Sequence, residues 1–368
     1  MFDRRLVQYF NWGLLGLFCL LAVTGSLTLY SALTAGSANP QIALFYKQMI
    51  WYTAGLFIMA LAFVLDYKFL ERWAYACYFF CVSLLVFVMF FGRVGGGSKR
   101  WLVFGPVSIQ PSEFMKIAVI IVLAKYFAKV VTMEGMSFKE LFLPMILVMI
   151  PCVLVLKQPD LGTAIMIFLI AASMTLFIKI EKRTLACLVA ASGVSLPLLW
   201  FFVLKQYQKQ RILTFLDPDR DPLNTGYHII QSKIAIGSGM IFGKGVFKGT
   251  QNALSFLPEQ HTDFIFSVFA EEWGFIGSAL LVTVFAMLIL WGLNIAYECR
   301  DTFGIILAVG VTGMIFWQVI INMGMVMGLM PVVGVPLPFI SYGGSSVISM
   351  MVCMGILMNI SMRRFMLD

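Results

Sequence analysis

A polar segment that ends in a carboxylate directly precedes one of the long apolar stretches of this chain. Residues 257–266 read LPEQHTDFIF, so Asp263 lies where the following apolar stretch begins. A partly desolvated carboxylate there could act as a general base toward a substrate hydroxyl, an effect of about 10² to 10⁴ in rate. It could also be a first-turn acid that complements the dipole of a helix. Thr262 could cap that helix without a second acid, which favours a chemical role for Asp263.

A glutamate and a lysine stand at the start of an earlier apolar stretch. Pro111 is typical of the first position of a helix, and Glu113 and Lys116 are three residues apart, so they share one helix face. The two could form a buried ion pair that only holds helices together. They could also line an outward-facing cavity below Lys99 and Arg100, where cations would suit a phosphate-bearing lipid headgroup.

Other polar features are less informative by residue type alone. Asp160 follows a short polar hinge and is expected to cap the next helix more often than to take part in chemistry. Glu271 and Glu272 lie within an apolar stretch, where a carboxylate is costly, so one of them should face a partner inside the bundle. The segment 336–346 (PLPFISYGGSS) begins with prolines that disfavour regular helix, and its small residues favour close helix contact.

The composition identifies the class of protein. Hydrophobic residues make up 61% of the 368 positions and charged residues 12%, and the mean hydropathy is +0.92, which excludes a soluble globular domain. Several apolar stretches reach the roughly 20 residues that a helix needs to cross a bilayer. We therefore predict an all-α, polytopic membrane protein with ten transmembrane helices. Their predicted ranges are 12–33, 49–65, 73–91, 112–131, 142–157, 161–178, 185–203, 264–293, 303–329 and 341–361.

The distribution of charge predicts the orientation of these helices. Lysine and arginine are concentrated in alternate short loops and at both ends of the chain, so the positive-inside rule places both termini in the cytoplasm. Residues 204–262 then form a large extracytoplasmic loop between helices seven and eight, inside a single membrane domain of residues 1–368. Within this loop Tyr227, Ile230 and Ile234 recur at helical spacing, which predicts a short helix in the outer interface or packed on the bundle.

The remaining composition argues against several other classes of site. The seven cysteines lie almost entirely in apolar segments without a CxxC pair, and two histidines are too few for a metal centre. The net charge of +8 suits an anionic membrane surface and gives no sign of nucleic-acid binding. We expect the cysteines to be small buried hydrophobic residues.

Several motifs, distributed from the first span to the last, together resemble one protein family. They are Arg100-Trp101, Pro111-Ser112-Glu113 with Lys116, QPDLGT at 158–163, PEQHTDF at 258–264, Asn322, GLMP at 328–331, Gly334 and FISYGGSS at 339–346. On these residues the chain resembles the SEDS proteins (shape, elongation, division and sporulation), which polymerise bacterial peptidoglycan. Its short tails and the FLDP segment at 215–218 resemble the elongation members more than the division members.

The resemblance implies a glycosyltransferase of the bacterial cytoplasmic (inner) membrane. Such an enzyme joins the disaccharide units of lipid II into β-1,4 glycan strands at the outer face, in an inverting displacement of undecaprenyl pyrophosphate. Asp263 corresponds to the essential acid of the family and would act as the catalytic base. The substrate-binding residues implied by the resemblance and by charge are Trp101, Glu113, Lys116, Asp160 and Arg100.

The resemblance also implies partners. They are lipid II, a class B penicillin-binding protein with transpeptidase activity, and other membrane proteins of the elongation complex. A divalent cation, Mg²⁺ or Mn²⁺, could share the pyrophosphate charge, and no organic cofactor is expected. The alternative is a lipid II flippase, because helices around a charged cavity could equally serve transport. A flippase would need polar groups toward the inner leaflet as well.

Overall fold

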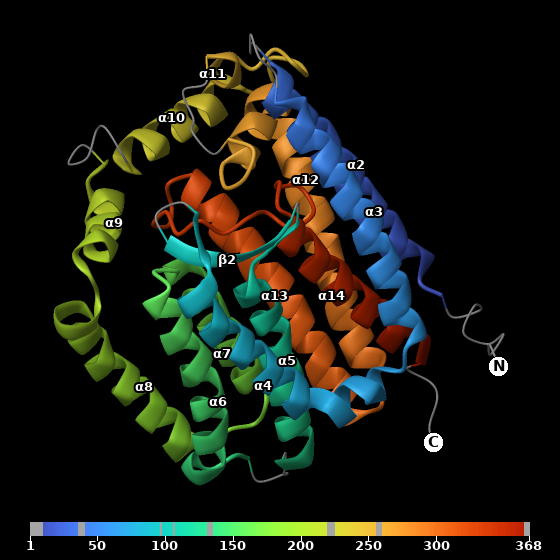
Figure 1. Cartoon of the computed structure of the whole chain (residues 1–368), viewed down its shortest axis with the longest axis vertical. Helices are drawn as coiled ribbons and strands as arrows, with labels where there is room; N and C mark the ends of the chain where they lie inside the picture. The colour runs from blue at the N-terminus through green and yellow to red at the C-terminus, as the bar shows by residue number, and fades with distance from the viewer. Residues whose placement is uncertain are drawn as a thin grey trace.

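Long helices make up most of the described chain, and they lie roughly side by side (Figure 1). The computed structural model describes residues 10–35, 41–95, 98–105, 107–130, 135–218, 225–254 and 260–363. The helices are α2 (Trp12–Thr34), α3 (Ile42–Val64), α4 (Tyr67–Phe91), α5 (Pro111–Val130), α6 (Phe138–Lys157), α7 (Leu161–Phe177), α8 (Lys182–Leu198), the π-helix η1 (Leu199–Val203), α9 (Gln206–Leu216), α10 (Thr225–Ser238), α11 (Thr250–Ala253), α12 (Ile265–Glu298), α13 (Thr302–Val326) and α14 (Gly344–Arg363).

The apolar helices identify an integral, polytopic membrane protein. Within the described ranges, seven helices are long and apolar enough to cross a bilayer, namely α2, α3, α4, α6, α12, α13 and α14. Helices also occupy the other three predicted ranges, but α7 and α8 have 17 residues each, and α5 carries Glu113, Lys116 and two further lysines. The structure thus gives seven strong spans, fewer than the ten predicted from the sequence.

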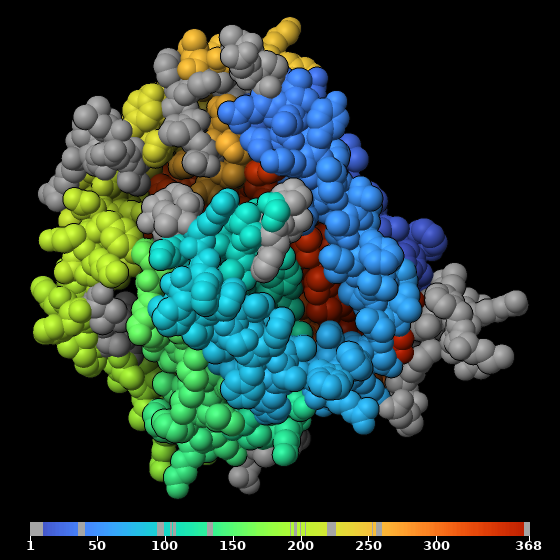
Figure 2. Space-filling view, viewed as in Figure 1, coloured from blue at the N-terminus to red at the C-terminus, as the bar shows by residue number. Residues whose placement is uncertain are grey.

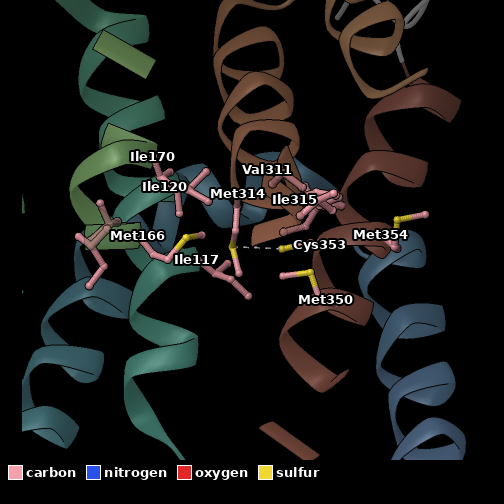
Figure 3. Close-up of a cluster of buried hydrophobic side chains, with 14 of the residues drawn as sticks. Ile117, Ile120, Met166, Ile170, Val311, Met314, Ile315, Met350, Cys353 and Met354 are labelled. Atoms are coloured by element: carbon pink, nitrogen blue, oxygen red, sulfur yellow. Dashed lines mark hydrogen bonds between the residues drawn. The ribbon is translucent and has the colours of Figure 1, made fainter. Parts of the chain in front are cut away.

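Two helices near the C-terminus form the centre of the bundle. Of the residues in the most apolar 18-residue stretch of each helix, 72% are buried in α13 and 89% in α14. The corresponding share is 22% in α3 and in α4, which are peripheral. Figure 2 shows only a narrow strip of α14 between the α3 side chains and the segment that follows α4. Side chains of α5, α7, α13 and α14 meet in an apolar cluster that includes Ile117, Met166, Met314 and Met350 (Figure 3). Central burial explains why residues of these helices can position a site.

A small antiparallel sheet joins α4 to α5, a feature that the all-α prediction missed. Its strands are β1 (Arg93–Gly95), β2 (Ser98–Phe104) and β3 (Val107–Ile109), in the order β1-β2-β3. Trp101 of β2 is opposite Arg93, and Leu102 is opposite Ile109. The outer strands have three residues each, which is too short for an alternating apolar pattern to be read from the sequence. The sheet covers the ends of the neighbouring helices in Figure 1.

The long segment between α8 and α12 contains the predicted short helix. This helix is α10, and it packs on α12 and α13. The hydroxyl group of Ser232 is fully buried, lies 2.8 Å from the Ser267 hydroxyl and donates to the Val326 carbonyl at 2.6 Å. Ile234, by contrast, is 45% exposed. Of the two predicted placements, packing on the bundle is therefore the observed one, and it uses a different helix face from the one that the spacing indicated.

A close helix-to-loop approach anchors the segment that precedes α14. Gly25 of α2 is buried, and a Cβ atom built on it would lie 2.4 Å from the Phe339 carbonyl oxygen and 2.7 Å from the Ile340 Cα. Glycine is the residue that permits this approach, because any side chain would meet backbone atoms that cannot rotate away. Gly16 of the same helix is exposed, and nothing lies within 4 Å of its Cβ position.

We predict that Gly25→Ala lowers the free energy of unfolding by about 1–3 kcal/mol, the usual cost of overpacking. The matched variant Gly16→Ala should be neutral or slightly stabilising, because alanine favours helix over glycine by about 1 kcal/mol. Thermal unfolding of both purified variants in the same detergent measures the difference. Equal stability of the two variants would contradict the close approach at Phe339.

Candidate active site

One cavity brings together all six residues that the sequence singled out for catalysis and substrate binding. Its volume is about 260 Å³. Arg100, Trp101, Glu113, Lys116, Asp160 and Asp263 all line it, together with Gln110, Thr163, Met166, Thr262, Gly334, Val335, Pro336, Tyr342, Gly343, Ser345 and Ser346. Five separate segments of the chain form the cavity wall, and four of them carry the six residues.

The cavity lies at one end of the bundle, where several helices begin. Helices α5, α7 and α14 contribute residues from their first turns or N-caps, and Thr262 and Asp263 directly precede α12. Unpaired N–H groups at a helix N-terminus carry roughly half a positive charge. Four helix N-termini therefore place partial positive charges at this end of the bundle, where two cations, Lys116 and Arg100, face three carboxylates of the same cavity.

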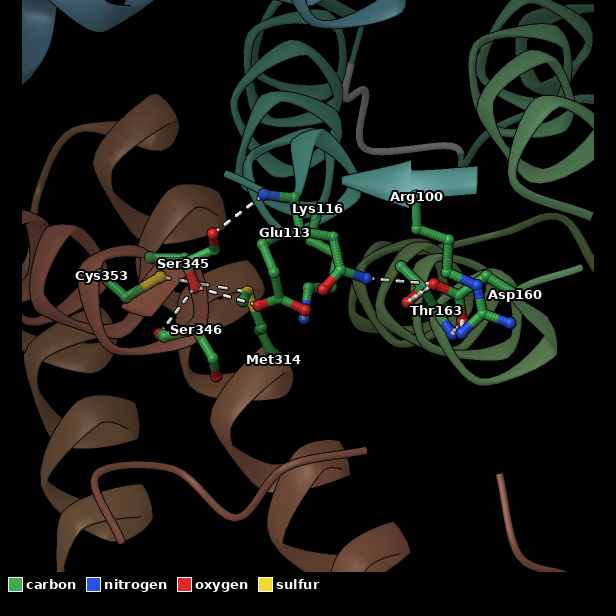
Figure 4. Close-up of polar contacts among 11 residues, drawn as sticks. Arg100, Glu113, Lys116, Asp160, Thr163, Met314, Ser345, Ser346 and Cys353 are labelled. Carbon is green, nitrogen blue, oxygen red and sulfur yellow. Dashed lines mark hydrogen bonds and ion pairs between the residues drawn. The ribbon is translucent and has the colours of Figure 1, made fainter. Parts of the chain in front are cut away.

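The glutamate and lysine of α5 form the predicted ion pair. Lys116 Nζ lies 2.8 Å from Glu113 Oε1, and the side chains are 2% and 5% exposed, respectively. The Ser349 hydroxyl of α14 donates to the other carboxylate oxygen, Glu113 Oε2, at 3.1 Å. The pair is thus both a link between α5 and α14 and part of the cavity wall, so the two interpretations of the sequence are compatible. Figure 4 shows it between Arg100 and the start of α14.

Asp160 has the capping role that the sequence favoured, and it also lines the cavity. Its Oδ1 accepts a hydrogen bond from the Thr163 backbone N–H at 3.2 Å, which makes it the N-cap of α7. Its Oδ2 accepts from the Thr163 hydroxyl at 2.9 Å and from the Gln110 amide at 3.2 Å. A carboxylate held by these donors is a fixed negative group, and it provides the anchor for the β3-to-α5 connection.

Arg100 is held mainly by backbone carbonyls. Its Nε donates to the Gln158 carbonyl at 3.2 Å and its Nη2 donates to the Pro159 carbonyl, while Nη1 lies 3.8 Å from Asp160 Oδ1. The guanidinium group has five N–H donors, so donors remain for a ligand after these contacts. Trp101, the next residue of β2, is half-buried at the cavity wall.

The segment that carries Asp263 is fixed through its backbone. Three successive carbonyls accept hydrogen bonds from the last third of the chain. The His261 carbonyl accepts from the Tyr342 N–H at 2.9 Å, and the Thr262 carbonyl accepts from the Ser341 hydroxyl at 2.6 Å. The Asp263 carbonyl accepts from Asn322 Nδ2 at 2.9 Å. Helix α12 begins at Ile265 with Phe264 as its N-cap and no acid in its first turn. The first-turn interpretation of Asp263 is therefore wrong.

A buried glutamine of α3 supports the same segment from the other side. The Gln48 amide is fully buried, donates to the Ser341 carbonyl at 3.2 Å and accepts from the Gly343 N–H at 3.2 Å. Burial raises the pKa of the neighbouring Tyr342 phenol, and Tyr342 lines the cavity. This chain of contacts runs from α3 to the backbone of residues 261–263.

The two adjacent glutamates of α12 do not line the cavity. Glu271 Oε1 accepts from Lys244 Nζ at 2.6 Å and from the Thr250 N–H at 2.9 Å. Glu272 Oε1 accepts from the Ser31 hydroxyl and from the Phe247 N–H, the latter at 3.2 Å. Both carboxylates thus accept hydrogen bonds from residues 244–251 and hold that segment against the bundle. The sequence predicted a partner for one of the two, and the structure shows partners for both.

Sequence reasoning missed several residues of the cavity wall. Gln110 and Thr163 were not singled out individually, and the 336–346 segment was interpreted as packing more than as part of a site. The signal for the last was available, since prolines and small residues before a helix start are typical of a wall formed by backbone. The described residues contain no group of three or more His, Cys, Asp or Glu side chains that could hold a metal ion.

Comparison with known proteins identifies the family. A family model described as a cell cycle protein of the FtsW, RodA and SpoVE type matches residues 7–365. The chain belongs to this FtsW/RodA/SpoVE family. Among curated members, the peptidoglycan glycosyltransferase MrdB of Escherichia coli (strain K12) is 43% identical over 350 residues, which cover 95% of this chain and 94% of MrdB.

Solved structures of the FtsW/RodA/SpoVE family share the fold. One is a chain from a structure described as "Structural coordination of polymerization and crosslinking by a peptidoglycan synthase complex". Its TM-score is 0.82 and its sequence identity 31%, and the match covers 97% of this chain and 98% of that chain. Another is the rod shape determining protein RodA of Thermus thermophilus, with a TM-score of 0.71, 28% identity and coverage of 97% and 98%. Both likenesses extend over nearly the whole chain.

The buried ion pair generates a stability prediction. Glu113→Gln leaves the Lys116 ammonium buried without its anion, and Lys116→Met leaves the carboxylate without its cation, so each should lower the free energy of unfolding by about 3–5 kcal/mol. The double variant should recover a large part of that loss, because no unpaired charge is left. Unfolding of the three variants in detergent measures this cycle.

The half-buried pair between Arg363 and Asp66 provides a control. Its side chains are 18% and 44% exposed, and Asp66→Asn should cost only about 0–1 kcal/mol. If the single variants at Glu113 and Lys116 were no less stable than the double variant, the pair would not be a buried, mutually dependent one.

Proposed function

We propose that this chain is a peptidoglycan glycosyltransferase that polymerises lipid II into β-1,4 glycan strands during cell elongation. The observation that carries the proposal is the single cavity shared by Asp263, Lys116 and the other four predicted residues. The names of the relatives support it, since MrdB is a peptidoglycan glycosyltransferase and RodA determines rod shape. The chain is then an enzyme of the hexosyltransferase class, and lipid II is its substrate.

The charge distribution of the cavity suits a pyrophosphate leaving group. Lys116 and Arg100 supply cations at the wall, and four helix N-termini direct N–H groups toward the same end of the bundle. Fixed donors of this kind stabilise negative charge as it develops, and they do so most strongly where water is excluded. Glu113 keeps Lys116 oriented through their 2.8 Å contact.

Asp263 is the general base of the proposed reaction. Its carboxylate takes the proton from the 4-hydroxyl of the acceptor sugar as that oxygen attacks the anomeric carbon of the donor. The bond from that carbon to the undecaprenyl pyrophosphate breaks in the same step, so an α-linked donor gives a β-linked product. Trp101 offers an aromatic face on which a sugar ring can stack, and Asp160 contributes a fixed polar wall.

The placement in the membrane belongs to the same proposal. Ten transmembrane helices correspond to α2 to α8 and α12 to α14, with both termini cytoplasmic in a bacterial inner membrane. Residues 204–262 then lie outside the membrane within one membrane domain of residues 1–368. The cavity faces outward in this arrangement, because it lies at the same end of the bundle as that segment (Figure 1).

A transpeptidase partner is consistent with the related complex. The structural neighbour described as coordinating polymerization and crosslinking is a peptidoglycan synthase complex. We propose that this chain likewise works with a class B penicillin-binding protein and with other membrane proteins of the elongation complex.

The cavity has no dedicated cation cage. Two of its carboxylates, Glu113 and Asp160, are already engaged by protein donors, and the described residues form no metal-binding group. A Mg²⁺ or Mn²⁺ ion would therefore enter with the pyrophosphate oxygens of the substrate, and we assign no step to a protein-bound metal.

Flipping of lipid II without chemistry is less compatible with the structure. The layer next to the cavity is closed by apolar side chains of α5, α7, α13 and α14, among them Ile120, Ile170 and Val311 (Figure 3). A flippase requires a polar path that reaches the other leaflet. The six predicted residues instead gather at one end of the bundle.

We predict that the purified protein makes glycan from lipid II in detergent, when Mg²⁺ or Mn²⁺ and its penicillin-binding protein are present. The Asp263→Asn variant should lower the rate of glycan synthesis at least about 100-fold. Asparagine keeps the shape of the side chain but cannot accept the proton. Moenomycin is included to inhibit contaminating class A enzymes, and products are resolved by gel electrophoresis.

Two controls make this experiment decisive. Asp217→Asn changes an exposed acid of the same predicted loop that does not line the cavity, and it should retain wild-type activity. Lipid II binding should be unchanged in Asp263→Asn. Absence of glycan from wild type that binds lipid II, even with the partner, would favour the flippase, since detergent leaves no bilayer to cross.

A further inference from the structure

A buried asparagine of α13 links two walls of the cavity. Asn322 is fully buried, and its Nδ2 donates to the Asp263 carbonyl at 2.9 Å and to the Val335 carbonyl at 2.7 Å. The orientation of its amide is fixed by these contacts, because the reverse orientation would place Oδ1 against two carbonyl oxygens. Both N–H donors of one side chain are therefore used to hold backbone that faces the cavity.

The two linked segments meet at the Asp263 carboxylate. Val335 follows Gly334, whose φ of +73° is in the left-handed region. A Cβ atom built on Gly334 would lie 3.1 Å from Asp263 Oδ2, so the carboxylate rests against the bare backbone of this glycine. Asn322 thus fixes the separation between the Asp263 backbone and the Gly334 backbone, against which the Asp263 carboxylate lies.

We propose that Asn322 is a positioning residue for the general base: it holds the Asp263 carboxylate against Gly334, in reach of the acceptor hydroxyl. The inference rests on the proposed function, in which Asp263 takes a proton. Proton transfer needs a heavy-atom distance of about 2.6–3.2 Å, and a misplacement of about 1 Å can cost about 100-fold in rate. Asn322 does not line the cavity, so it acts through Asp263 and not on the substrate.

Other contacts of the 261–263 segment do not have this role. Ser341 and the Tyr342 N–H hold the carbonyls of Thr262 and His261, one and two residues away from the base. Ser341 Oγ also accepts from the Leu337 N–H at 2.8 Å, so it stabilises its own turn. Asn322 reaches the base residue itself and the opposite wall with one side chain.

The chain offers a matched control one helical turn away. Gln318 of α13 is also a fully buried amide, and neither its Oε1 nor its Nε2 has a hydrogen-bond partner among the described residues. It does not line the cavity. Gln318→Leu removes a buried amide from the same helix without changing a cavity wall, so it separates a general effect on α13 from an effect on Asp263.

The test compares Asn322→Leu, Gly334→Ala and Gln318→Leu with wild type in the detergent polymerisation assay with the partner present. Asn322→Leu keeps the number and branching of the side-chain heavy atoms but has no donor, and Gly334→Ala pushes on the carboxylate from the opposite side. We expect kcat to fall about 10- to 100-fold in both, with KM and lipid II affinity within about twofold of wild type. Gln318→Leu should match wild type in all three quantities.

A second readout does not depend on polymerisation. The rate at which a water-soluble carbodiimide modifies Asp263, measured by peptide mass spectrometry, should change in Asn322→Leu and in Gly334→Ala but not in Gln318→Leu. If wild type makes no glycan, the proposed function fails, and this labelling still decides whether Asn322 positions Asp263. Should Asn322→Leu fail to fold, Gly334→Ala and Asn322→Ala, which removes the two donors without burying a charge, provide the same comparison.

Three results would overturn the inference. Wild-type kcat and wild-type labelling of Asp263 in Asn322→Leu would show that the two hydrogen bonds do not position the base. A parallel loss of lipid II affinity and kcat would indicate a general structural role. The same kcat loss in Gln318→Leu would assign the effect to α13 as a whole.

Discussion

Charged side chains can be buried in an apolar helix bundle only if the protein itself provides their partners. The pair of Glu113 and Lys116 meets this requirement at 2.8 Å, with Ser349 on the second carboxylate oxygen. Neither charge can be left alone when buried, and because both lie on α5 that helix pairs them itself; the Ser349 hydroxyl then joins α14 to the pair. The buried pair therefore forms one wall of the cavity, and four helix N-termini converge on the same end of the bundle.

Backbone contacts, more than side-chain contacts, determine where the proposed base lies. Residues 261–263 are not helical, and their carbonyls would be unsatisfied in an apolar environment without donors from α13 and the segment before α14. That segment is itself held by Gln48 of α3 and by the close approach of Gly25. Helices α2 and α3 thus help to place the proposed base through non-helical backbone, although neither helix lines the cavity.

The sequence predicted the helical ranges well, because long apolar stretches are a strong signal, and the helix caps such as Asp160 followed from residue type. The grouping of six residues in one cavity came from the family resemblance, since spacing alone does not say that position 100 lies near position 160. The small sheet was missed because its outer strands are too short to show periodicity. The role of Asn322 was out of reach, because its two acceptors are separated from it by 59 and 13 residues and are backbone atoms.

The order in which the chain is made has a consequence for the site. Glu113 is hydrogen-bonded to Ser349, and Gln110 to Ser345, across 236 and 235 residues. The loop that donates to the carbonyls of His261 and Thr262 directly precedes α14. Four of the five cavity segments are synthesised before that final helix enters the membrane. The cavity therefore requires α14, and a nascent chain that stops before α14 carries the acids and cations without the wall that encloses them.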